Sequence, residues 1–145
     1  MSVGAGKLAR MAGYSPTPQA RKLGLKPGLR LVLDHPPTAW ELAETPDVRW
    51  VADGEPADVI ISFVRDPGEL VARVRALAEQ IFPDGALWFA WPRRAAGHHS
   101  DVTENGIRDA VLPLGLVDVK VAAIDDDWSG LKIVWRRARR CRKES

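Results

Sequence analysis

Apolar and polar positions follow two patterns along this chain. Residues 29–34, 58–64 and 85–91 are short, nearly continuous apolar runs, which predict strands that are covered on both faces of a parallel sheet. From residue 66 to residue 81 the apolar side chains return every three or four positions, which predicts an amphipathic helix. This succession of strands and helices favours an α/β fold.

Four helix starts are marked by capping residues. Thr17 before a proline predicts a helix that ends near Gly24. Residues 38–41 have the threonine-to-glutamate spacing of a capping box, and Asp66 is followed by a proline and an acidic residue. The cap-and-acid pattern recurs at residues 101–104. We therefore expect a helix to follow each of these positions.

The last two strands are predicted at residues 116–124 and 131–135. The connection between them is too short for a parallel crossover, so we expect an antiparallel hairpin. The predicted fold is an open, mostly parallel Rossmann-like sheet with helices on both faces, closed by this C-terminal hairpin. We expect an α/β domain over residues 16–136, a flexible segment at 1–15 and a disordered basic tail at 137–145.

The first strand-to-helix turn lacks the glycines that nucleotide-binding α/β folds place there. His35, Pro36 and Pro37 follow the first strand. Glycine in such a turn lets the backbone approach a cofactor and direct its N–H groups at it, whereas two prolines remove two donors. His35 beside Asp34 is either a proton carrier, since histidine titrates near neutral pH, or only a part of the turn.

The order of the segments resembles that of class I methyltransferases. A lysine-proline-glycine turn at 26–28 opens the first strand, and a proline-x-glycine turn at 83–85 matches the one that opens the fifth strand of that family. More closely, the chain resembles a small bacterial family of unknown function with a truncated methyltransferase-like domain, in segments 11–15, 91–94 and 128–132. The resemblance covers roughly residues 11–136 and implies a shortened Rossmann-like fold.

Two departures from methyltransferases concern the cofactor. Residues 35–37 replace the glycine loop that would cradle S-adenosylmethionine. Asp53 could be the acid that binds the ribose, but it follows what we expect to be a stunted edge strand at 48–52, and only residues 54–57 precede the next strand. We therefore expect no cofactor and a non-catalytic domain. The alternative is an S-adenosylmethionine-dependent methyltransferase with an atypical cofactor turn.

The carboxyl edge of the sheet is the expected binding site, because ligands of open α/β sheets lie at strand ends. Helix N-termini and arginines at this edge favour an anion, and tryptophans offer flat apolar walls. We predict that it binds a small anionic ligand or a protein partner. The predicted ligand-binding residues are His35, Arg65, Trp91, Arg93, Arg94, Asp126, Trp128 and Ser129. Alternatively, the arginines pair with the acids at 125–127 and the tryptophans only plug the edge.

Composition narrows the remaining function classes. No apolar run is long enough to cross a membrane, and the single cysteine suits a cytoplasmic protein. Six of the 21 lysines and arginines lie between residues 136 and 143, so a weaker alternative is a protein that touches nucleic acid through its basic tail. No metal site is expected, because adjacent His98 and His99 rarely point the same way and predict a solvated loop.

Overall fold

The computed structural model describes residues 18–52 and 54–140. Thr17, Asp53, the predicted flexible segment 1–15 and residues 141–145 lie outside the described residues. In chain order the helices and strands are α2 (Gln19–Leu23), β1 (Arg30–Asp34), β2 (Arg49–Trp50), β3 (Val59–Phe63), α3 (Pro67–Ile81), β4 (Ala86–Pro92), α4 (Glu104–Val111), β5 (Leu116–Ala123) and β6 (Trp128–Trp135). Short 3₁₀ helices lie at Arg94–Ala96, Leu112–Leu114 and Arg137–Arg139.

The strands of the described chain form one six-stranded sheet in the order β2-β1-β3-β4-β6-β5. β2, β1, β3 and β4 are mutually parallel, and β6 is antiparallel to both of its neighbours. The predicted open, mostly parallel sheet with an antiparallel C-terminal hairpin is confirmed. β6 begins earlier than predicted, at Trp128, so the hairpin connection is shorter than its sequence suggested.

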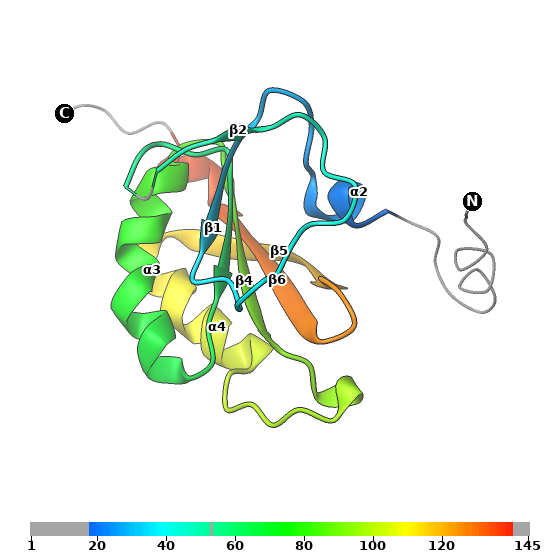
Figure 1. Cartoon of the computed structure of the whole chain (residues 1–145). Coiled ribbons are helices and arrows are strands. Elements are labelled where there is room, and N and C mark those ends of the chain that lie inside the picture. The colour runs from blue at the N-terminus through cyan, green and yellow to red at the C-terminus, as the bar shows by residue number, and fades with distance from the viewer. Residues whose placement is uncertain (1–17, 53, 141–145) are drawn as a thin grey trace, which may run out of the picture.

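Each face of the sheet has its own apolar core. α3 and α4 cover one face, and α2 lies on the other (Figure 1). Side chains alternate between the faces along each strand, so Phe89 of β4 packs under α3 and α4, whereas its neighbour Trp88 packs under α2. The α2 face is completed by the irregular segment 35–48, which contributes Trp40 and Leu42.

The two longer helices begin with side-chain caps. Asp66 accepts a hydrogen bond from the backbone N–H of Glu69 at 3.0 Å, as the sequence predicts. α4 is capped by Thr103, which accepts from the N–H of Gly106 at 3.0 Å. The predicted cap at Asp101 is therefore two residues too early. No helix of the described residues is long and apolar enough to cross a membrane.

The helix predicted after Thr38 does not form. Ala39 and Glu44 have φ values of 64° and 47°, in the left-handed region that interrupts a right-handed helix. Trp40 packs its ring on Phe63 instead, and its backbone N–H donates to the carbonyl of Pro37 at 3.0 Å, three residues earlier, as in a turn. A helix of this length is marginal alone, so the tertiary contact of the tryptophan overrides the capping box.

Two weaker elements bound the domain. β2 is a two-residue strand parallel to β1, in agreement with the predicted stunted edge strand. At the other end, within the segment predicted as the tail, Arg137–Arg139 form a 3₁₀ helix. Arg140 donates from its guanidinium to the carbonyl of Trp135 at 2.9 Å, which holds this segment against β6.

Candidate functional site

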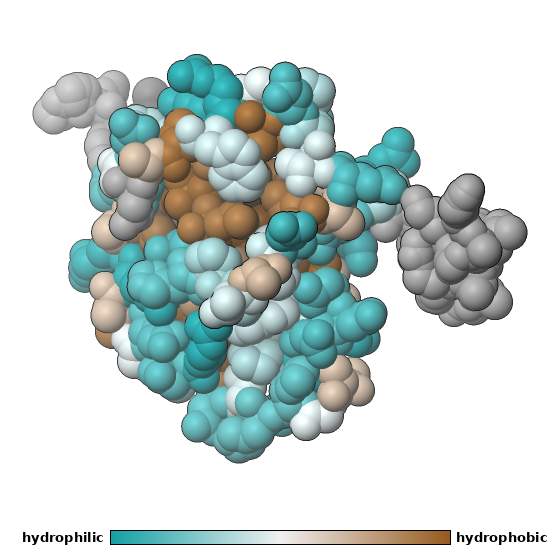
Figure 2. Space-filling view, viewed as in Figure 1, coloured by the Kyte–Doolittle hydropathy of each residue, from teal (hydrophilic) through white to brown (hydrophobic). Residues whose placement is uncertain are grey.

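A hollow opens at the carboxyl ends of β1 and β2. Its volume is about 370 Å³, within the usual range of ligand pockets. The lining residues are Val32, Leu33, Asp34, His35, Trp50 and Val51. Figure 2 shows apolar side chains gathered over β1 and β2 on this side of the molecule. β2 is too short to cover the end of β1, so the hollow follows from the stunted edge strand.

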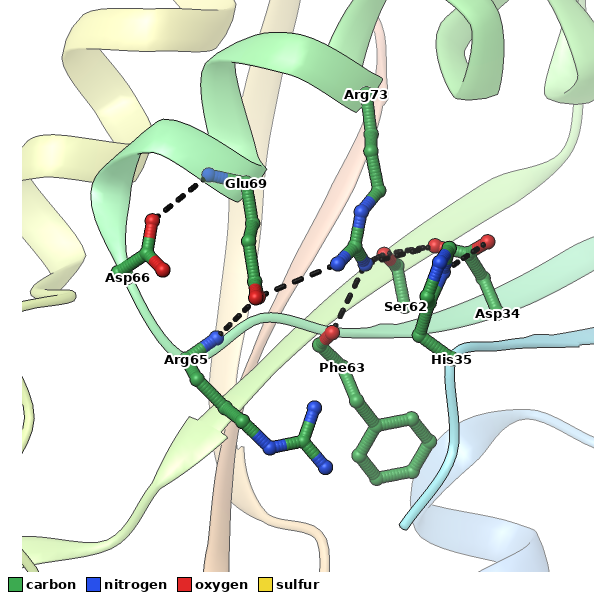
Figure 3. A network of polar contacts seen from close by, with 8 residues as sticks. All are labelled: Asp34, His35, Ser62, Phe63, Arg65, Asp66, Glu69 and Arg73. Carbon is green, nitrogen blue, oxygen red and sulfur yellow. Dashed lines mark hydrogen bonds and ion pairs between the residues drawn. The ribbon is translucent and has the colours of Figure 1, made fainter.

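Asp34, at the end of β1, is the centre of a polar network (Figure 3). Ser62 of β3 donates from Oγ to Asp34 Oδ2 at 2.7 Å, and Arg73 of α3 donates from Nη1 to the same oxygen at 3.1 Å. His35 Nδ1 lies 3.0 Å from Asp34 Oδ1. The carboxylate is buried, so these partners replace the water it would otherwise bind.

Arg73 is itself held at both ends of its guanidinium. Nη1 also donates to the carbonyl of Phe63 at 2.9 Å, and Nη2 lies 3.2 Å from Glu69 Oε1, one turn earlier on α3. Glu69 Oε1 in turn accepts from the backbone N–H of Arg65 at 2.7 Å. The network therefore ties the ends of β1 and β3 to the first turns of α3 and leaves Asp34 few free lone pairs.

An aromatic cluster covers the same edge on the α2 face. The ring of Phe63 meets Trp40 and Trp128 edge to face, with centroids 4.9 and 5.0 Å apart. Trp40 also donates from Nε1 to Asp125 Oδ2 at 2.8 Å. Segment 35–48 is thus fastened across the strand ends to the β5–β6 connection.

Arg65, Trp128 and Arg93 are the predicted site residues that the structure brings together. The Arg65 guanidinium lies over the Trp128 ring, 5.3 Å from its centroid, within the range of a cation–π contact. It points away from Arg73 (Figure 3). Arg93 follows Pro92, the register partner of Trp128, and donates to the backbone carbonyl of Asp126 at 3.2 Å.

The other predicted residues lie apart from this group. Trp91 is buried beneath α3 and α4, on the opposite face from Trp128, and so forms no common wall with it. Ser129 is the register partner of Trp91. Arg94 donates to the carbonyl of Ser100 at 3.1 Å. The exposed side chain of His35 borders the hollow.

The histidine loop uses its side chains for local pairs. His98 Nε2 lies 2.9 Å from Asp127 Oδ1, and His99 Nε2 lies 3.3 Å from Asp101 Oδ1. All four side chains are substantially exposed. The loop therefore helps to hold the β5–β6 connection near Arg93, whose backbone N–H donates to the carbonyl of Asp127 at 2.8 Å.

Comparison with solved structures shows the fold. A Streptococcus agalactiae protein of the NADB-Rossmann superfamily has a TM-score of 0.51, with 11% identity over 87% of this chain and 71% of that one. The ribosomal protein L11 methylase of Lactobacillus delbrueckii has a TM-score of 0.51, with 11% identity over 81% of this chain and 75% of its own. Magnesium protoporphyrin IX methyltransferase of Synechocystis PCC 6803, solved with bound S-adenosylmethionine, has a TM-score of 0.50, with 15% identity over 92% of both chains.

The fold is a shortened class I methyltransferase-like fold. No family model and no curated protein matches the sequence. β3 follows β2 directly in sequence, the connection between them is too short for a helical crossover, and β2 is an edge of the sheet.

The residues at the carboxyl edge do not fit S-adenosylmethionine. Pro36 and Pro37 have no N–H to offer an anionic group. Both carboxylate oxygens of Asp34 already have partners, and Trp40 lies on Phe63 at the end of β3.

Sequence reasoning missed Arg73 and Trp40 as residues of this edge. Arg73 lies between the apolar positions Leu70 and Val74, four residues after Glu69, so an arginine interrupts the buried side of the helix. That interruption is the signal that could have found it. Trp40 had no such signal, because its contact with Asp125 joins segments 85 residues apart.

Proposed function

We propose that this chain is a non-catalytic methyltransferase-like domain that binds an anionic group at the carboxyl edge of its sheet, through Arg65 and Arg93. The group is carried by a small ligand or by an acidic segment of a protein partner. The observation that supports this most is the Arg65 guanidinium, which is held over Trp128 without a carboxylate partner among the described residues.

The acids near these arginines are engaged elsewhere. Asp125 accepts from Trp40, and Asp127 pairs with His98. Arg93 reaches the backbone of Asp126, not its carboxylate, at 3.2 Å. Within residues 18–52 and 54–140, neither Arg65 nor Arg93 forms an ion pair. Their positive charges therefore remain available to an external anion.

The geometry suits an anion with two or more oxygens. A guanidinium presents its N–H donors in a planar fork that matches a carboxylate or a phosphate. Stacking on Trp128 limits the rotation of the Arg65 side chain, so less conformational entropy is lost when an anion binds. Its backbone is fixed too, since its N–H donates to Glu69.

Removing both arginines should weaken anion binding. We expect R65Q/R93Q to bind pyrophosphate or a hexaglutamate peptide at least about tenfold more weakly than the unaltered protein, because a charge-assisted hydrogen bond contributes about 1.5–3 kcal/mol. Isothermal titration with both probes measures the loss and tells a small anion from an acidic peptide. R75Q is the matched control, since Arg75 is exposed on α3. Equal affinities for the unaltered protein and the double variant would contradict the proposal.

An S-adenosylmethionine-binding enzyme is the second candidate function. It is favoured by the methyltransferase-like fold and by the hollow at the ends of β1 and β2. From the edge described above, we expect titration with S-adenosylmethionine or S-adenosylhomocysteine to show no binding tighter than about 100 μM, which corresponds to about −5.5 kcal/mol. Tighter binding of either compound would favour the enzyme over the non-catalytic domain.

A further inference from the structure

Three lysines lie on the face of the sheet that α2 borders. Lys120 of β5 and Lys132 of β6 are register partners, and Lys22 comes from α2. Lys120 donates from Nζ to the carbonyl of Lys22 at 3.3 Å, and Lys22 donates from Nζ to the carbonyl of Ala123 at 3.1 Å. These bonds join α2 to β5, and we call Lys22, Lys120 and Lys132 together the lysine cluster.

Lys120 and Lys132 lie directly opposite each other on the antiparallel strands β5 and β6, so two positive charges are neighbours. Such a pair destabilises a sheet unless something neutralises it. Lys132 is also half-buried beside Trp88, its register partner on β4. Burial, and secondly the charge of Lys120, lower the pKa of Lys132. The arrangement is therefore unfavourable in the protein alone.

No carboxylate of the described chain neutralises the lysine cluster. Within residues 18–52 and 54–140, none of the three lysines has an acidic oxygen within 4.0 Å. Asp118, two residues before Lys120, pairs instead with Arg108 of α4 at 2.9 Å. Each ammonium has three donors, and the contacts above use one of Lys22 and one of Lys120. Several donors remain free to bind a ligand.

We propose that the lysine cluster is a phosphate-binding site, distinct from the arginine edge. Three compact ammonium charges suit a multiply charged, tetrahedral anion, whereas the planar fork of arginine suits a carboxylate equally well. The cluster is accessible because α2 has five residues and leaves Lys120 exposed beside it. A bound phosphate would neutralise the positive charges of Lys120 and Lys132 and so relieve their mutual repulsion.

The phosphate has two sources that share this chemistry, a small phosphorylated compound and the backbone of a nucleic acid. Inorganic pyrophosphate and a single-stranded oligonucleotide are the two probes that separate them. If the source is a nucleic acid, three phosphate contacts predict a log–log salt dependence with a slope of about −2. Pyrophosphate binding without oligonucleotide binding assigns the site to a small compound.

The test compares the unaltered full chain with K120Q/K132Q. We expect the double variant to bind the preferred probe at least tenfold more weakly in a titration. Without any probe it should melt at the same temperature as the unaltered protein or higher, because the like-charge opposition is gone. R75Q removes one positive charge on the opposite face of the sheet and is the control, which should bind as the unaltered protein does.

Two results would overturn the proposal. One is that the unaltered protein binds neither probe, and the other is that K120Q/K132Q binds as tightly as R75Q. If the double variant does not fold, the single substitution K132Q repeats the test. It should fold, because the Lys132 side chain makes no hydrogen bond among the described residues that the substitution would break. The unaltered protein should titrate with two pyrophosphate sites, of which R65Q/R93Q loses the one at the arginine edge and keeps the one at the lysine cluster. Failure of one site is thereby distinguishable from failure of the other.

Discussion

Replacing Arg73 by methionine should lower the free energy of unfolding by about 3 kcal/mol, because it leaves the buried carboxylate of Asp34 without its cation. The side chains of Arg73 and Asp34 are only 16% and 8% exposed, so water does not readily replace the lost partner. The carbonyl of Phe63 also loses its donor at 2.9 Å. Methionine keeps the length and helix propensity of the side chain, which isolates the polar loss. Urea unfolding measures the change.

Arg75→Met is the matched control on the same helix. Arg75 is exposed, so this change should alter the free energy of unfolding by less than about 0.5 kcal/mol. In a double-mutant cycle, D34N and R73M each leave one buried charge without its partner, whereas D34N/R73M removes both charges. The double variant should therefore be more stable than the sum of the two single losses indicates. Additive losses would mean that Arg73 acts through packing and not through Asp34.

This network bears on the function of the edge. Asp34 lies at the end of β1, next to the turn at residues 35–37. The sequence resemblance implies that this turn corresponds to the one that holds the cofactor in methyltransferases. Here the carboxylate binds Ser62 and Arg73, both within the protein. A loss of stability on Arg73→Met, without a change in anion binding, would assign Asp34 and Arg73 to holding the strand ends together. Binding would then rest on Arg65 and Arg93.

The parts of the fold that could be predicted are those with strong local patterns. The apolar run at 58–64 became β3 within one residue at each end, and the cap at Asp66 opened α3 as expected. The hairpin followed from the short connection before β6. The helix after Thr38 failed because a long-range contact, Trp40 on Phe63, outweighed a local cap. Local signals cannot show such a contact.

The sequence predicts at which edge of the sheet the candidate site residues lie, but it does not predict on which face of the sheet each side chain lies. The topology places Trp91 and Trp128 on adjacent strands at one edge, as expected. Trp128, however, stands opposite Pro92 and not opposite Trp91, and this offset of one residue sends the two rings to opposite faces. The register of β4 on β6 is set by the whole hairpin. The sequence of either strand alone does not contain it.

Substituting Gly130 by alanine should destabilise the protein by about 2–3 kcal/mol, because there is no room for a side chain at this position of β6. A Cβ there would lie 2.7 Å from Ile124 Cδ1 and 3.0 Å from Trp88 Cε3. Both neighbours are almost completely buried, so neither can turn aside. This explains why a glycine stands in the tryptophan-serine-glycine segment at the start of β6. Thermal and urea unfolding measure the loss.

Ile124→Ala tests whether the clash is the cause. It removes the atoms at 2.7 and 2.8 Å from the added Cβ, so G130A/I124A should be more stable than the sum of the single losses by at least about 1 kcal/mol. Gly68→Ala is the comparison, since the one neighbouring atom there is Asp66 Oδ1 at 3.1 Å, so this change should cost no more than the cap of α3, about 1 kcal/mol. If Gly130→Ala and Gly68→Ala have equal effects, close packing against Ile124 is not what requires the glycine. Because Trp128 begins the same strand, loss of this packing should also loosen the stack that holds Arg65, so Gly130→Ala should weaken anion binding at the edge as well.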